Sequence, residues 1–181
     1  SQQVIDDFNL AIIARLFEQY PNHKMVMLPQ TSSIPTDKNS DYHYFIHLSE
    51  QSKYSQQIEV LPDTYGSDTQ QAIIQRASLV VGARYHSIVF AINNACPFIA
   101  LNYEHKIEGL LRILNLNKHE VNITDIFASK EHTSDALKQF DRLLTQPIDY
   151  NLKEKSQEAH AIAANGFLSF LKQCINYESS P

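Results

Sequence analysis

The sequence predicts an α/β fold, a doubly wound parallel sheet covered by helices on both faces. Two observations support this class. Short apolar runs rich in β-branched residues, too brief for helices, alternate along the chain with longer segments in which apolar residues recur at helical spacing. With 181 residues, 43% of them hydrophobic, the chain is long enough for one well-buried domain, so residues 1–181 are expected to form a single domain.

The first predicted elements are an amphipathic helix and a short strand. Residues 3–20 predict a helix that ends before Pro21, because apolar side chains repeat on one face: Val4, Phe8, Ile12, Leu16 and Phe17. Residues 25–28 predict a buried strand. The polar, turn-rich residues 30–40 follow the carboxyl end of that strand, so they are either a wall of a binding crevice or a solvated connection.

A second helix and a second strand follow. Asp41 is expected to cap a helix that runs to about Gln51, and residues 58–61 predict the next strand. After a turn that contains Pro and Gly, Ser67 or Asp68 is expected to start a third helix.

The centre of the chain predicts a strand, a turn, a helix and another strand, which together form a βαβ crossover. The first strand is Leu79-Val80-Val81, and Gly82 breaks it. Apolar residues at helical spacing continue through residues 87–95, Pro97 stops that helix, and residues 98–101 form the next strand. Open α/β sheets bind ligands at the first turn of such a unit.

The last part of the chain is mainly helical. Residues 104–114 predict a helix, and residues 120–123 a short edge strand. Thr133 or Ser134 is expected to cap a further helix. Residues 150–177 predict a long final helix whose drifting apolar stripe is expected to wrap a curved surface.

Composition excludes several classes of function. A formal net charge of −5 argues against a nucleic-acid binder, which usually carries a basic face. Two cysteines make neither a disulfide framework nor a metal motif, and Cys96 is expected to be an inert core thiol. The sequence has no apolar run long enough to span a membrane and no visible signal peptide. It starts at Ser1 without methionine, which is expected both of an excised fragment and of a processed or tagged chain.

Two candidate functional residues lie at the first turn of the βαβ unit. Arg84 sits where the amide groups and dipole of a helix N-terminus favour an anion, and its guanidinium adds a bidentate donor. From position alone, a surface arginine that pairs with a carboxylate is an equal alternative. His86 is suited to proton transfer near neutral pH, or it is a structural histidine bonded to a backbone carbonyl.

Tyr103 and Lys106 follow the next strand and are expected to face the same crevice, where Lys106 offers a second positive charge. Glu104 is a weaker candidate, as a base or a helix cap. His43 and His47 are four residues apart, yet no carboxylate joins them at matching spacing, so no metal site is expected. The sequence contains no GxGxxG motif and no Walker loop, which disfavours NAD and P-loop nucleotide chemistry.

This central segment resembles the polysaccharide pyruvyl transferases. The resemblance extends over about residues 73–116 and rests on these positions: Gly82, Arg84, His86, Pro97, Tyr103 and Lys106, followed by Gly109-Leu110-Leu111 and Leu114-Asn115-Leu116. It implies two Rossmann-like halves that face a cleft, as in the two-domain GT-B-like fold. This chain would be the C-terminal half, and the missing N-terminal domain would complete the site.

The resemblance also implies an activity. The family moves the enolpyruvyl unit of phosphoenolpyruvate onto a sugar diol as a pyruvate ketal, in cell-surface or exopolysaccharide biosynthesis. Arg84 and His86 would be catalytic, and the substrate would be held by Gly82, Arg84, Tyr103 and Lys106. The acceptor would be a saccharide or lipid-linked saccharide, in the cytoplasm or at the inner face of the membrane. No metal or other cofactor is implied, and the fragment alone should be inactive.

Two other classes of function remain open. One is a nucleotide-sugar glycosyltransferase or epimerase of the GT-B type, which also holds a diphosphate at a helix N-terminus. The other is a non-catalytic sugar-binding domain that retains the fold.

Overall fold

A computed structural model describes residues 2–31, 40–126, 128–146 and 151–178 of the chain. Its strands pair in parallel, which confirms the α/β class. β1 (Met25–Met27) pairs with β2 (Ile58–Val60). β4 (Phe98–Asn102) lies between β3 (Val80–Gly82) and β5 (Glu120–Asn122), so the last strand is an edge strand as predicted.

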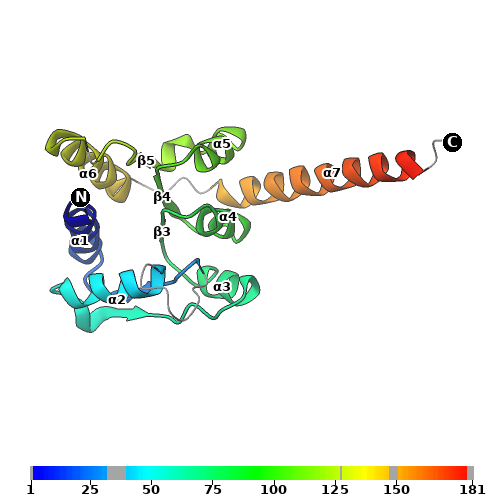
Figure 1. The fold of residues 1–181 in the computed structure, drawn as a ribbon. Helices are drawn as coiled ribbons and strands as arrows, with labels where there is room; N and C mark the ends of the chain where they lie inside the picture. The colour runs from blue at the N-terminus through cyan, green and yellow to red at the C-terminus, as the bar shows by residue number, and fades with distance from the viewer. Residues whose placement is uncertain (1, 32–39, 127, 147–150, 179–181) are drawn as a thin grey trace.

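Helices cover both faces of the three-stranded sheet (Figure 1). α1 (Gln2–Gln19) and α6 (Lys130–Thr145) lie on one face. α4 (Tyr85–Asn93) and α5 (His105–Ile113) lie on the other, with α3 (Ser67–Ile74) beside α4. This arrangement is compatible with the predicted Rossmann-like fold.

The side chains of β4 separate two apolar clusters. Successive residues of a strand point to opposite faces, and all five residues of β4 are buried. Phe98 and Ala100 join the cluster under α4 and α5, whereas Ile99 and Leu101 join the cluster under α1 and α6. A strand buried on both faces explains why this segment is continuously apolar.

A third cluster belongs to the two-stranded unit. Ile13 and Phe17 of α1 pack against Met27 of β1 and Leu48 of α2 (Asp41–Gln51). The sequence predicted one continuous sheet. Within the described residues, the hydrogen-bonded ladders instead form two parallel sheets, the pair β1-β2 and the trio β3-β4-β5, and the pair has this apolar cluster of its own.

Helix starts and ends differ from the predictions in ways that local hydrogen bonds explain. Ser40, not Asp41, caps α2, because its hydroxyl accepts from the backbone N–H of His43 at 3.3 Å. In the same way Ser129 caps α6, so this helix starts before Thr133 and Ser134. Two 3₁₀ turns, η1 (Ser55–Gln57) and η2 (Asn117–His119), precede β2 and β5.

α4 begins two residues earlier than predicted and ends at Asn93, well before Pro97. Its end is a turn in which Ala95 adopts a left-handed conformation with φ 50°, and the N–H of Cys96 donates to the carbonyl of Ala91 at 2.8 Å. This backbone turn stops the helix, and the proline follows it.

The final helix, α7 (Leu152–Glu178), packs on the domain through its first turns and then extends away from it (Figure 1). Leu152 is buried, and the Ser156 hydroxyl donates to the carbonyl of Asn93 at 2.8 Å. Further along, Ile162 and Phe167 are 48% and 61% exposed. The expectation that its apolar stripe wraps a curved surface is therefore wrong beyond the first turns, since no described element lies against that part of the helix.

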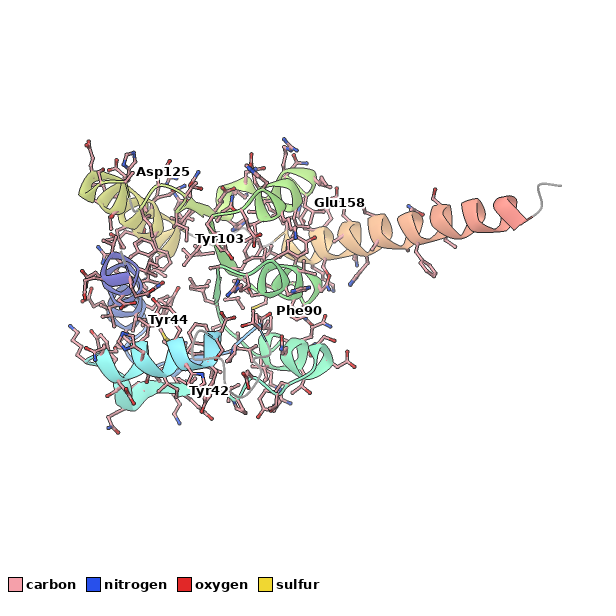
Figure 2. The ribbon with its side chains drawn as sticks, viewed as in Figure 1. Tyr42, Tyr44, Phe90, Tyr103, Asp125 and Glu158 are labelled. Atoms are coloured by element: carbon pink, nitrogen blue, oxygen red, sulfur yellow. The ribbon has the colours of Figure 1, made fainter. Side chains whose placement is uncertain are left out.

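A buried polar network joins α1 to α2, near Tyr44 (Figure 2). The Asp6 carboxylate accepts hydrogen bonds from Gln2 Nε2 at 2.9 Å and from the Tyr44 hydroxyl at 3.0 Å. His47 Nε2 lies 3.3 Å from its other oxygen. Burial acts to raise the pKa of Asp6, but these hydrogen bonds outweigh it and leave that pKa below its ordinary value.

Asp6→Asn is expected to destabilise the protein by about 1–3 kcal/mol near neutral pH, because the folded state stabilises the charged carboxylate. Since the folded pKa lies below the unfolded one, this stabilisation is complete above the unfolded pKa of about 4 and is lost as pH falls through the folded pKa. Urea unfolding near neutral pH and at about pH 3 should show the difference between variant and parent shrinking at the lower pH. An equal difference at both would contradict the assignment, and Asp7→Asn, on the exposed side of α1, is the matched control.

Candidate functional site

The carboxyl ends of parallel strands meet at one edge of a sheet, and the candidate site lies there. Arg84 follows β3, and Tyr103 follows β4. The structure brings these two side chains together, with Arg84 Nη1 3.4 Å from the Tyr103 hydroxyl. It also brings in a residue from α2: Arg84 Nη2 donates to Asp41 Oδ1 at 2.7 Å. Tyr103 lies beside the strands in Figure 2.

Arg84 occupies the N-cap position of α4, with extended backbone angles and no side-chain cap bond. Its carbonyl accepts the first helical bonds, from the N–H groups of Ser87 at 3.1 Å and Ile88 at 3.4 Å. The N–H groups of Tyr85 and His86, which precede them, have no partner within the helix and point out of its N-terminus. A guanidinium beside such N–H groups favours an anion.

The sequence left open whether Arg84 binds an anion or pairs with a carboxylate, and the structure contains the carboxylate pair. The hydrogen bond with Asp41 raises the pKa of Arg84, against the opposing effect of burial. Because 46% of the Arg84 side chain is exposed, the pair adds at most about 1 kcal/mol to stability. Its effect is mainly to fix where the guanidinium lies.

His86 lies in the first turn of α4 but outside the hydrogen-bonded group of Arg84, Asp41 and Tyr103. Its side chain is exposed, and its ring centroid is 6.0 Å from that of Tyr85 and 6.1 Å from that of Phe90. Among the described residues no hydrogen bond to the His86 ring is found, so the structural alternative, a bond to a backbone carbonyl, is not observed there.

Glu104 and Lys106 begin α5. Glu104 occupies the N-cap position without a side-chain cap bond, and its backbone N–H donates to Asn102 Oδ1 at 3.1 Å. Asn102 is buried and donates in turn to Glu120 Oε1 at 2.8 Å, which ties the end of β4 to β5. Lys106 is exposed and makes no ion pair within the described part of the chain.

Gly82 is the last residue of β3 and is buried. A Cβ at this position would overlap Ser87 Oγ and lie 3.1 Å from Ile88 Cδ1. The prediction attributed this glycine to a turn close to ligand, whereas the structure shows a close approach of β3 to α4. Ser87 Oγ donates to the Arg84 carbonyl at 2.6 Å, so this contact also supports the backbone of Arg84.

Sequence reasoning missed Asp41 as the partner of Arg84. The second Asp41 oxygen accepts from the backbone N–H of Gln30 at 3.2 Å, and both atoms of the Gln30 side-chain amide are buried without a hydrogen-bond partner among the described residues. The Ser40-Asp41 pair at the start of α2 was the available signal, since one residue can cap the helix and leave the side chain of the other for a different partner. Most of the predicted crevice wall, residues 32–39, lies outside the described residues.

The histidine pair does not form one site. His43 Nδ1 bonds the Ser40 hydroxyl at 2.8 Å, while His47 faces Asp6. Within the described ranges no three His, Cys, Asp or Glu side chains are placed to hold a metal ion. Cys96 is buried, and burial raises the pKa of its thiol to about 11, as expected of an inert core thiol.

The chain matches a protein-family model and curated relatives. A family model described as polysaccharide pyruvyl transferase matches residues 5–105, more than half of the chain. The amylovoran biosynthesis protein AmsJ of Erwinia amylovora is 26% identical over 94 residues, which are 52% of this chain and 23% of that protein. The matched part thus spans about a quarter of that relative's length. No solved structure matches.

Gly82→Ala is expected to destabilise the protein by about 1–3 kcal/mol, because the new methyl group must displace Ser87. Ser87→Ala in the same chain should recover part of this loss by removing the overlapping hydroxyl. Gly109→Ala is the matched control: a Cβ there meets nothing within 4 Å, and alanine favours the middle of α5 by up to about 1 kcal/mol. Urea unfolding measures all four proteins, and full stability of Gly82→Ala would contradict the close approach.

Proposed function

The chain belongs to the polysaccharide pyruvyl transferase family, and on that premise we propose that it transfers the enolpyruvyl unit of phosphoenolpyruvate to a saccharide as a pyruvate ketal. The observation that carries the proposal is the position of Arg84, at the N-terminus of α4 and at the carboxyl edge of the sheet, inside the part of the chain that matches the family. Asp41 and Tyr103 lie in the same matched part.

The proposed donor would require positive charge at this edge of the sheet. Phosphoenolpyruvate carries a carboxylate and a phosphate, and both are held best by charge-assisted hydrogen bonds. Arg84 and the free N–H groups of α4 supply one anion site. Lys106, exposed at the start of α5, supplies a second charge, and the buried end of β3 at Gly82 keeps the first turn of α4 in place.

We assign His86 to proton transfer. Ketal formation adds a proton to the methylene carbon of the donor, and positive charge develops on the neighbouring carbon while a sugar hydroxyl attacks it. The second hydroxyl of the diol then displaces phosphate, and each hydroxyl gives up its proton. An imidazolium at the mouth of the site is suited to the first step. Its alternative role is to hold the departing phosphate.

The acceptor and the setting follow from the family. AmsJ is named for the biosynthesis of amylovoran, and by analogy we propose a saccharide or lipid-linked saccharide acceptor in exopolysaccharide biosynthesis. The aligned part covers 23% of that relative, so we propose that a second Rossmann-like domain, in a GT-B-like arrangement, completes the site and is needed for activity. We place the reaction in the cytoplasm or at the inner membrane face. No helix in the described residues is long and apolar enough to cross a membrane.

Ligand protection tests the donor. Phosphoenolpyruvate at about 100 times its Kd should raise the unfolding free energy by about 2.7 kcal/mol. Arg84→Lys keeps the positive charge but loses the planar, bidentate N–H donors of the guanidinium. It should therefore weaken donor binding by about 1–3 kcal/mol without lowering the melting temperature of the free protein. Protection by uridine or guanosine diphosphate, but not by phosphoenolpyruvate, would instead favour a nucleotide-sugar enzyme. Protection by none of them, even in the full-length protein, would favour a non-catalytic domain.

His86→Asn tests the proton transfer in the complete enzyme. Asparagine keeps hydrogen bonding but delivers no proton near neutral pH, so turnover should fall by about 10²–10⁴-fold with donor affinity nearly unchanged. Weaker donor binding with modest change in turnover would assign His86 to phosphate, and a lower melting temperature with normal specific activity would make it structural. His160→Asn, on the exposed part of α7, is the control.

A further inference from the structure

Asp41 is held on both sides. Its side chain is 13% exposed; Oδ1 accepts from Arg84 Nη2 at 2.7 Å and Oδ2 accepts from the Gln30 backbone N–H at 3.2 Å. Ser40 already caps α2, so the Asp41 side chain is not needed for the cap. Its carboxylate faces the candidate site instead, at the start of the helix.

Arg84, in contrast, has a long and half-exposed side chain, which by itself would adopt many rotamers. Asp41 contacts one terminal nitrogen and the Tyr103 hydroxyl lies 3.4 Å from the other. Two contacts on a planar group fix its orientation as well as its position. The remaining N–H donors of the guanidinium stay available for a ligand.

We propose that Asp41 is a positioning residue that orients the Arg84 guanidinium over the N-terminus of α4 to receive the anionic donor. The role rests on the proposed function for the identity of that donor. An arginine ordered in advance loses less conformational entropy when it binds, so affinity depends on the residue that orders it. Asp41 thereby couples α2 to the anion site without touching the ligand.

The opposite role would be competition, in which Asp41 occupies the place of the donor anion and must leave before binding. Its geometry argues against this. A carboxylate that moved away would lose the Gln30 bond as well as the Arg84 bond, and it would leave a mostly buried position. The two roles predict opposite signs: loss of the Asp41 charge weakens donor binding if Asp41 positions Arg84, and strengthens it if Asp41 competes.

A double-mutant cycle between Asp41→Asn and Arg84→Lys tests the proposal. Affinities for phosphoenolpyruvate and for inorganic phosphate are measured by calorimetry, and KM and kcat are measured in the complete enzyme. Asp41→Asn should weaken binding of both ligands by about 3- to 10-fold and raise KM with kcat nearly unchanged. In the Arg84→Lys background, Asp41→Asn should lower these affinities by less than about twofold, since the partner of Asp41 is already altered.

The controls separate a structural role from positioning. Glu50→Gln removes a charge from the exposed end of α2 and should leave both affinities unchanged. Independent effects of Asp41→Asn and Arg84→Lys, or tighter binding by Asp41→Asn, would overturn the proposal. If Asp41→Asn does not fold, Asp41→Glu, which keeps the charge but displaces it, takes its place in the cycle.

Failure of the proposed function gives a different result. If the parent binds inorganic phosphate but neither binds nor converts phosphoenolpyruvate, the donor assignment is wrong. The phosphate arm of the cycle then still decides whether Asp41 acts through Arg84. A parent that binds both ligands, with Asp41→Asn indistinguishable from it, leaves the donor assignment intact and rejects the positioning role.

Discussion

Burial of β4 on both faces is the constraint on which the rest of the structure depends. A five-residue strand with no exposed side chain needs an apolar layer on each side, and the chain supplies α1 and α6 on one side and α4 and α5 on the other. Parallel pairing with β3 and β5 then aligns the carboxyl ends of the strands. The groups that follow those ends share one edge as a result, which is how Arg84 and Tyr103 meet although 19 positions separate them.

The sequence predicted most elements because their signals are local. The apolar run at β4 and the helical spacing after Arg84 can be recognised without the rest of the chain. The strands and the helix of the crossover were therefore predicted close to their observed bounds. Asp41 could not be assigned in this way. Its partner is a guanidinium 43 positions away, which no local pattern around Asp41 indicates.

Other differences between the predictions and the structure have the same origin. Gly82 was recognised, but the close approach of the Ser87 hydroxyl was not foreseen, because only the packing of β3 against α4 reveals it. The apolar stripe of α7 predicted a helix correctly, yet a stripe does not say whether a surface lies opposite it. The separation into two ladders likewise depends on how α1 and α2 pack on β1, beyond the pattern of any single strand.

Cys96 gives the core a chemical reporter. Alkylating reagents react with thiolates, and the sulfur of Cys96 is both covered by the cluster under α4 and held protonated by the same burial, while its S–H donates to the carbonyl of Ala77 at 3.3 Å. In the native state, Cys96 is therefore protected from alkylation in two ways: the reagent cannot reach the sulfur, and the sulfur is not ionised. The extent of modification at this one position therefore reports how often the apolar layer beneath the candidate site opens, in the way that amide exchange reports the breaking of backbone hydrogen bonds.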